Sequence, residues 1–142
     1  MNRRALLKCA AWIGAAKAMA LSLPAQTIPA DDRPAQKAIV LYCDLAFPPD
    51  REQEMLHRFH HDFKPAAEKH EGYIDLKMLK LRKVIQGGPA PAANINYRFQ
   101  LTYQSEELRQ RWITSDVHKR LWPQIEALVS NKDYLVLLTD NA

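Results

Sequence analysis

Residues 97–128 read YRFQLTYQSEELRQRWITSDVHKRLWPQIEAL, and this stretch decides the fold. Large apolar side chains alternate with polar ones from Ile95 to Tyr103, which is the period of two that a half-buried strand shows. Ser105 then offers an N-cap oxygen, and two glutamates follow it where the helix dipole favours negative charge. The next apolar residues recur at helical spacing: Leu108, Trp112 and Ile113. The sequence therefore predicts a strand, a turn and a helix.

A second helix is predicted directly after the first. Ser115 and Asp116 interrupt the first helix and can cap another one, whose apolar residues are Val117, Leu121, Ile125 and Leu128. Pro123 has no N–H to donate and disfavours a helical Trp122, so we expect a kink or a restart at this point. A kinked helix with an aromatic side chain on each side of the break can wall a cavity. The alternative, which the residue type favours, is that Trp112 and Trp122 are core residues.

The rest of the chain supplies three more strands and one more helix. We expect strands at residues 37–45, 73–84 and 134–138, and a helix at residues 51–70. Pro65 should kink this helix, and Gly72 should end it as a left-handed cap. The last strand, YLVLL, is apolar throughout and should be buried on both faces.

The predicted order is strand, helix, strand, strand, helix, strand. It is the order of the ferredoxin-like βαββαβ arrangement, an α+β fold in which an antiparallel sheet carries both helices on one face. The apolar positions of the second strand change phase between Met78 and Leu79, which predicts a bulge there or a strand covered on both sides. Apolar residues thus remain for the other face, on the second and fourth strands especially, and the roughly 112 residues after position 30 make a small core. We therefore expect a homodimer, in which a second copy buries that face.

Residues 1–30 have the layout of an export signal, with four basic residues, no acidic one, and an apolar run at residues 10–23. Arg3 and Arg4 resemble a twin-arginine motif, but the residues around them depart from it, so the general secretory route stays open. Cleavage is expected after Ala20, Ala25 or Ala30. A retained anchor is the alternative, although the run is shorter than the ~20 residues of a spanning helix. We expect a periplasmic or secreted protein that meets the export machinery, with a flexible tail at residues 31–36 and one domain at residues 37–142.

Charge and cysteine content narrow the function classes. The chain has 142 residues, with 20 Lys and Arg against 16 Asp and Glu, but four of the basic residues belong to the signal. The remainder is formally neutral, which argues against nucleic-acid binding. Cys43 is the single cysteine after the signal, so it cannot form an internal disulfide, and no Cys/His spacing typical of a metal site occurs. We expect no metal ion and no cofactor.

The segment SEELRQRWITSDVHKRLWPQI, residues 105–125, resembles the second half of the antibiotic biosynthesis monooxygenase family. The matching pattern is a strand, then Ser-Glu-Glu with a Trp five residues after the second Glu, then Ser-Asp-Val and a helix. This resemblance implies a ferredoxin-like α+β domain that dimerises into a shared barrel. Members of that family include quinol monooxygenases and heme-degrading monooxygenases.

The resemblance also implies a pocket between the sheet and the helices. Its expected substrate-binding residues are Tyr97, Phe99, Trp112, Trp122 and Cys43. His60, which falls on the apolar stripe of its helix, and His118 are the candidate catalytic bases, because histidine titrates near neutral pH. Cofactor-free members of the family hold a phenol- or quinol-like substrate in such a pocket and let it react with dioxygen.

Three functions stay open on these grounds. The first is a monooxygenase-like enzyme acting on a small aromatic, and the second is a non-catalytic dimeric module that binds a small hydrophobic ligand. The third is an oligomeric structural domain whose pocket its own side chains fill. Heme degradation is not expected, because the position of the family's heme-ligating His falls on Trp122 and that of its pocket Asn falls near Cys43.

Overall fold

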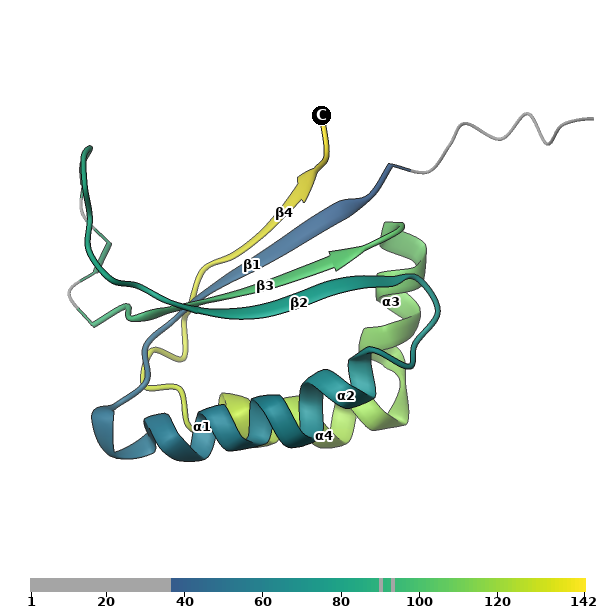
Figure 1. The fold of residues 1–142 in the computed structure, drawn as a ribbon, viewed down its shortest axis with the longest axis horizontal. Helices are drawn as coiled ribbons and strands as arrows, with labels where there is room; N and C mark the ends of the chain where they lie inside the picture. The colour runs from purple at the N-terminus through teal and green to yellow at the C-terminus, as the bar shows by residue number, and fades with distance from the viewer. Residues whose placement is uncertain (1–36, 90, 93) are drawn as a thin grey trace, which may run out of the picture. The chain divides into compact units, whose positions relative to one another are not determined.

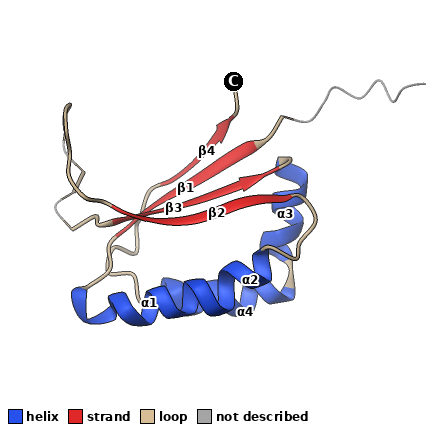
Figure 2. Cartoon of the chain, in the orientation of Figure 1, coloured by secondary structure: helices blue, strands red, loops and turns tan. Residues whose placement is uncertain are grey.

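A computed structural model describes residues 37–89, 91–92 and 94–142 (Figure 1). Within them a four-stranded sheet lies over a layer of helices, and all the helices cover the same face (Figure 2). The ferredoxin-like α+β prediction is confirmed. The predicted export signal at residues 1–30 and the predicted tail at residues 31–36 lie outside the described residues.

The sheet has the strand order β2-β3-β1-β4, and every neighbouring pair is antiparallel. Its strands are β1 (Ile39–Leu45), β2 (Tyr73–Lys80), β3 (Tyr97–Tyr103) and β4 (Val136–Asp140). Strand β3 shows the predicted alternation, because every second residue from Tyr97 to Tyr103 is buried against the helices. The two central strands, β1 and β3, therefore supply most of the sheet's share of the core.

The first predicted helix forms in four consecutive pieces. They are a 3-10 turn at Pro49–Arg51, α1 at Glu52–Arg58, a π-helical segment at Phe59–Phe63 and α2 at Lys64–Ala67. The N–H of Lys64 bonds the carbonyl of Phe59 five residues back, just before Pro65, which has no N–H. Pro65 thus disturbs the helix as expected, and the disturbance takes the form of a π turn.

Two serines define the second helical pair, α3 (Glu106–Thr114) and α4 (Asp116–Glu126). Ser105 Oγ accepts from the N–H of Leu108 at 3.2 Å, which confirms the predicted N-cap. Ser115 Oγ accepts from the N–H of His118 at 3.2 Å and donates to the Trp112 carbonyl at 2.6 Å. Ser115 therefore ends α3 and begins α4 with one hydroxyl group.

The restart predicted near Trp122 and Pro123 is wrong, because α4 is continuous from Asp116 to Glu126. Pro123 removes one backbone bond, the one that would reach the carbonyl of Lys119. Lys119 is exposed, so water can take the place of the missing donor. The break between the two tryptophans lies at Ser115 instead, which puts Trp112 and Trp122 on different helices.

Gly72 closes the turn between α2 and β2, and its role as a left-handed cap is confirmed by its φ of +87°. A Cβ atom at this position would lie 2.6 Å from Leu108 Cδ1 on α3. Glycine is thus required both by the backbone conformation and by the close approach of α3.

The edge strands differ from the prediction in two ways. The irregularity of β2 lies between Tyr73 and Asp75, not near Met78 and Leu79; Met78 faces the helices opposite Phe99, and Leu79 faces outward opposite Arg98. The expected burial of the last strand on both faces is also wrong. Strand β4 pairs only with β1 at the sheet's edge, where the helices do not reach it, and all five of its residues are exposed.

The outer face of the sheet carries apolar side chains on its second and fourth strands, as the sequence pattern predicted. Its centre carries the ion pair between Asp44 and Arg98. Its apolar side chains sit on the two edge strands, where Leu79 and Leu137 are each 41% exposed. The surface left for a second copy therefore combines a charged centre with apolar margins.

Candidate functional site

A cavity of about 150 Å³ lies between the sheet and the second helical pair. Cys43 of β1 and Phe99 of β3 face each other across the strand pairing and form the sheet wall. Trp112 of α3 and Trp122 of α4 form the helix wall. Val136, which pairs with Cys43, borders the cavity from the exposed edge strand. Four of the five predicted substrate-binding residues are thus brought together.

His118 lies in the first turn of α4 and completes the aromatic wall. Its ring is 5.1 Å from the Trp112 ring, edge to face, and 6.2 Å from the Trp122 ring, stacked at 16°. Phe63 packs behind them, 5.6 Å from Trp112 and 5.5 Å from Trp122. The bend at Ser115 creates this arrangement, because it turns the start of α4 back toward the end of α3.

Two titratable groups of the cavity wall, His118 and Cys43, are neutral at pH 7. Burial, with the nearby charge of Arg109, lowers the pKa of His118 to about 4. Burial, with the neighbouring carboxylate of Asp44, raises the pKa of the Cys43 thiol to about 12. His118 therefore offers a ring nitrogen that can accept a hydrogen bond, but it is a weaker base than an ordinary histidine.

Two further polar residues border the cavity and were not predicted from the sequence. Arg109 is 9% exposed, and its guanidinium donates to Glu106 through Nε and Nη2, both at 2.6 Å. Tyr134 donates to Glu126 Oε1 at 2.6 Å, and burial together with this bond raises its pKa. A signal for Arg109 was present, since it precedes Trp112 by three residues and so shares its helix face.

Trp112 leaves one donor unused. Its side chain is fully buried, and its indole Nε1 finds no hydrogen-bond acceptor among the residues that the structure describes. An unpaired N–H in a buried site costs free energy that a ligand oxygen can recover. Trp112, a residue that lines the cavity, therefore holds a buried donor without an acceptor among those residues.

Two predicted site residues lie elsewhere. The prediction that His60 lies on the buried stripe is wrong: Phe59 and Phe63 take the buried positions of the π segment, and His60, one residue further round, is exposed. Tyr97 is buried, but at the other end of β3, where it bonds Glu52 and packs edge-on against Phe47 at 5.7 Å. Neither residue borders the aromatic cavity.

No group of three or more potential metal ligands occurs within the described part of the chain. His57 and His61 are near each other, with ring centroids 4.5 Å apart, and both lie on the exposed face of the first helix. Among the same residues, none of the helices has both the length and the apolar character needed to span a bilayer.

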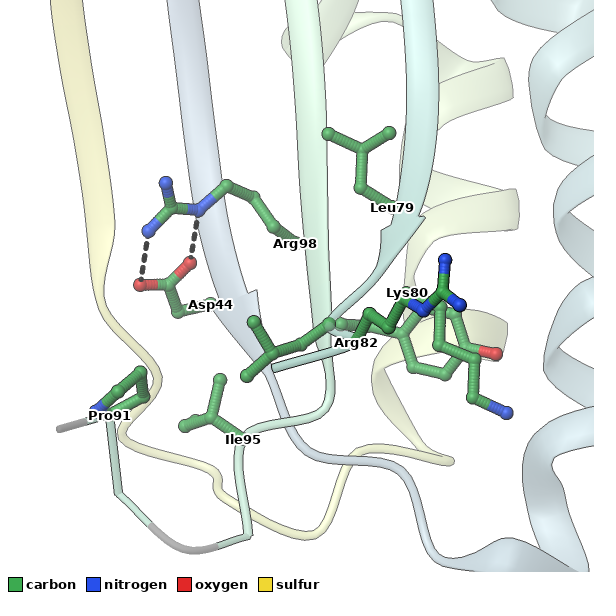
Figure 3. Close-up of a pocket in the computed structure, with 9 residues that line it drawn as sticks. Asp44, Leu79, Lys80, Arg82, Pro91, Ile95 and Arg98 are labelled. Atoms are coloured by element: carbon green, nitrogen blue, oxygen red, sulfur yellow. Dashed lines mark hydrogen bonds and ion pairs between the residues drawn. The ribbon is translucent and has the colours of Figure 1, made fainter. Parts of the chain in front are cut away.

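A second hollow, of about 290 Å³, lies on the outer side of the sheet where β2 and β3 meet the loop between them (Figure 3). Arg98 donates to Asp44 there through two bonds, at 2.7 and 3.0 Å, so these two charges satisfy each other. Leu79 and Ile95 form apolar walls nearby. This hollow lacks the tryptophans and the unpaired buried donor, so the aromatic cavity is the stronger candidate site.

Comparison with known proteins identifies the class of fold. No family model matches the sequence, and no curated relative matches it either. Solved structures do match over most of their length, among them a dimeric ferredoxin-like protein of unknown function from Jannaschia sp. CCS1, 14% identical, with a TM-score of 0.58 over 74% of this chain and 98% of that one. The fold is that of the dimeric α+β barrel proteins.

Two other similar structures carry a proposed activity as antibiotic biosynthesis monooxygenases. The one from Caulobacter crescentus CB15 is 13% identical, with a TM-score of 0.59 over 76% of this chain and 92% of that one. The one from Bordetella bronchiseptica is 11% identical, with a TM-score of 0.58 over 75% and 99%. Identities this low show the shared fold, which agrees with the resemblance found in residues 105–125.

Proposed function

We propose that this protein is a monooxygenase-like enzyme that oxidises a small aromatic or quinol substrate in the aromatic cavity without a cofactor. The observation that carries the proposal is the meeting of Phe99, Trp112 and Trp122 with the neutral ring of His118 in one cavity. Apolar walls with a few polar groups are the usual form of a small-molecule site. The similarity of the fold to proteins with a proposed monooxygenase activity supports the reaction class.

In the proposed reaction the substrate supplies the electrons. A 1,4-hydroquinone reacts with one O₂, one oxygen atom replaces a ring hydrogen, and the other leaves as water, so that the product is a hydroxyquinone. The protein then needs to bind the quinol, stabilise its anion and exclude bulk water. Because the pKa of His118 is about 4, this residue acts chiefly as an acceptor that orients a substrate hydroxyl.

A non-catalytic module that binds a small hydrophobic ligand is the second candidate. The low pKa of His118 favours it, because a weak base gives little help in removing a substrate proton at pH 7. The volume of the cavity does not distinguish the two candidate functions. At about 150 Å³ it is below the ~300–1,000 Å³ of pockets for drug-sized ligands, so neither function fits a large macrocycle such as heme.

Oxygen uptake by the purified full chain with a panel of 1,4-hydroquinones tests the enzyme. We expect His118→Ala to reduce uptake, because it removes a polar wall of the cavity. His60→Ala is the matched control, since that histidine is exposed and outside the cavity. Absence of uptake by the unmodified protein, with retained binding of a hydroquinone, would favour the non-catalytic module.

The location and assembly belong to the same proposal. We infer export to the periplasm or beyond from the basic, acid-free start of residues 1–30. We infer a homodimer from the exposed apolar edge strand β4, and the dimeric relative from Jannaschia supports it.

A further inference from the structure

We propose that Arg109 anchors an anionic oxygen of a single-ring aromatic ligand in the aromatic cavity, with the indole N–H of Trp112 as a second donor. This inference rests on the proposed function and deepens it, because it names the substrate class. The shared chemistry is a planar ring that carries a carboxylate or a phenolate.

The guanidinium of Arg109 has one nitrogen, Nη1, that its bonds to Glu106 do not use. Nε and Nη2 are taken by the two oxygens of Glu106, whereas Nη1 has no acceptor in residues 37–89, 91–92 and 94–142. The side chain borders the cavity and is 11% exposed, so Nη1 is available to an acceptor that enters the cavity. In a mostly buried site, a charged donor bonds an anionic oxygen more strongly than a neutral one.

The charge of Arg109 is felt across the cavity. It lowers the pKa of His118 on the helix wall, and it opposes the rise in the pKa of Cys43 on the sheet wall. The nearby carboxylates have partners of their own, since Glu106 binds Arg109 and Glu126 accepts from Tyr134. The charge of Glu126 acts on the pKa of His118 and of Cys43 in the opposite direction. An incoming anion thus meets the guanidinium of Arg109 together with two carboxylates, Glu106 and Glu126, that already accept from donors of the chain.

Trp112 supplies the second donor from the same helix face, three residues after Arg109. Its Nε1 is buried without an acceptor in the described part of the chain. A carboxylate or phenolate oxygen can accept from a guanidinium and an indole N–H at once, because it has more than one lone pair. The two donors therefore favour a ligand that carries an oxygen acceptor, and the aromatic side chains favour a ligand with a planar ring.

The cavity's size limits the ligand to one ring. A cavity of about 150 Å³ in another protein accommodates benzene, and this one has a volume of about 150 Å³. Phe99 and Trp122, with ring centroids 5.2 Å apart, shape its apolar end. Bicyclic and larger ligands require the cavity to open, so a benzenoid anion is the natural fit.

Benzoate and benzamide test the proposal, because they have nearly the same shape and differ in charge. Binding to the purified full chain is measured by calorimetry, and the indole N–H signal of Trp112 is followed by NMR, with Trp112→Phe identifying that signal. We expect benzoate to bind more tightly than benzamide and to shift the Trp112 signal. Arg109→Gln should weaken benzoate by at least about tenfold and leave benzamide unchanged.

Arg111→Gln is the matched control. Arg111 lies on the same helix and pairs with Glu107 at 2.6 Å, but its side chain is 62% exposed and outside the cavity. If Arg109→Gln does not fold, Glu106→Gln is tested in its place. This variant removes the carboxylate that pairs with the guanidinium of Arg109, so the affinity for benzoate should stay the same or rise.

The outcomes separate this inference from the proposed activity. Equal binding of benzoate and benzamide, unaffected by Arg109→Gln or by Glu106→Gln, overturns the anchor even if hydroquinones are oxidised. Charge-selective binding that depends on Arg109, without oxygen uptake, supports the anchor and overturns the proposed enzyme. Failure of hydroquinone, benzoate and benzamide alike to bind overturns both.

Discussion

At the scale of the residue, Trp112 belongs both to the hydrophobic core and to the wall of the aromatic cavity. Its ring packs against Phe63 at 5.6 Å and His70 at 4.6 Å, so part of its surface belongs to the core. Trp112 also lines the cavity, and its indole N–H has no acceptor among the described residues. The prediction that Trp112 is a core residue is therefore confirmed, and its role in a binding site stays a prediction.

Substitution of Trp112 separates the two parts. Trp112→Ala should lower the free energy of unfolding by about 3–5 kcal/mol, because it empties a buried site. Trp112→Phe should cost clearly less, since it keeps much of the apolar volume and removes the unpaired N–H, but it should weaken ligand binding or turnover. Thermal and urea unfolding beside oxygen uptake with 1,4-quinols provide the measurement. Severe destabilisation by Trp112→Phe with unaltered activity contradicts a role in the site.

His118 makes stability depend on pH. Its folded pKa is about 4 against an ordinary 6.5, so between these values the unfolded chain binds a proton that the folded chain does not. Its contribution is therefore complete above pH 6.5 and is lost as pH falls toward 4. We expect a loss on the order of 1–2 kcal/mol, reduced by partial exposure of the ring. Urea midpoints at pH 7 and pH 5 measure it, and in His118→Asn the difference should shrink.

At the scale of the element, short contacts in the turns hold the helices to the sheet. Gly72 is the clearest case, because it combines a left-handed backbone with a close approach to Leu108. The turn that follows α2 thereby seats β2 beside the start of α3. A loss of this contact should disturb the whole helical pair that carries Trp112.

Gly72→Ala should destabilise the fold by roughly 2–3 kcal/mol, since it adds both backbone strain and a clash. Gly87→Ala is the matched control: its φ is +96°, but nothing lies within 4 Å of an added Cβ. It should therefore show only the strain, about 1 kcal/mol. Urea unfolding gives the free energy of unfolding of both variants, and of Leu108→Ala with and without Gly72→Ala. The clash is the part of the Gly72→Ala effect that disappears when Leu108 is already alanine. Equal effects at the two glycines contradict the packing argument.

At the scale of the whole molecule, the edge strand β4 stands out. Residues 135–138, Leu-Val-Leu-Leu, are between 41% and 54% exposed. An exposed apolar edge strand is unusual in a protein that stays monomeric. A second copy that covers this strand would also cover the side of the aromatic cavity that Val136 borders.

Light scattering on the purified full chain should therefore give about twice the monomer mass. Leu137→Lys should shift the protein toward monomer, because it places a charge on the outer face at the edge of the sheet. Ile85→Lys is the control, since Ile85 is 87% exposed in the loop after β2 and outside the sheet. A stable monomer at micromolar concentration would rule out the shared barrel.

Export is a prediction about the whole chain. If the twin-arginine route is used, Arg3→Lys combined with Arg4→Lys should retain the precursor inside the cell. Fractionation and immunoblotting of a tagged full chain measure this. Unchanged export of the double variant leaves the general secretory route, and absence of export for the unmodified chain contradicts the signal.

The sequence by itself determined the features that depend on neighbours along the chain. Alternation from Tyr97 to Tyr103 predicted β3, because a strand's faces repeat every two residues. The N-caps at Ser105 and Ser115 and the left-handed Gly72 were predictable for the same reason, since each depends on local backbone geometry. The element order then predicted the ferredoxin-like sheet.

Only the tertiary structure decided what lies beside what. Helical spacing put His60 on a buried stripe, but the π turn before Pro65 and the packing of Phe59 left it exposed. The apolar sequence of the last strand indicated full burial, but its place at the sheet's edge exposed it. Arg109 shares the helix face of Trp112 in the sequence, but its burial at the cavity arises only because α3 turns that face toward the sheet. Burial, pairing and the cavity arise from contacts between distant parts of the chain, which no local pattern encodes.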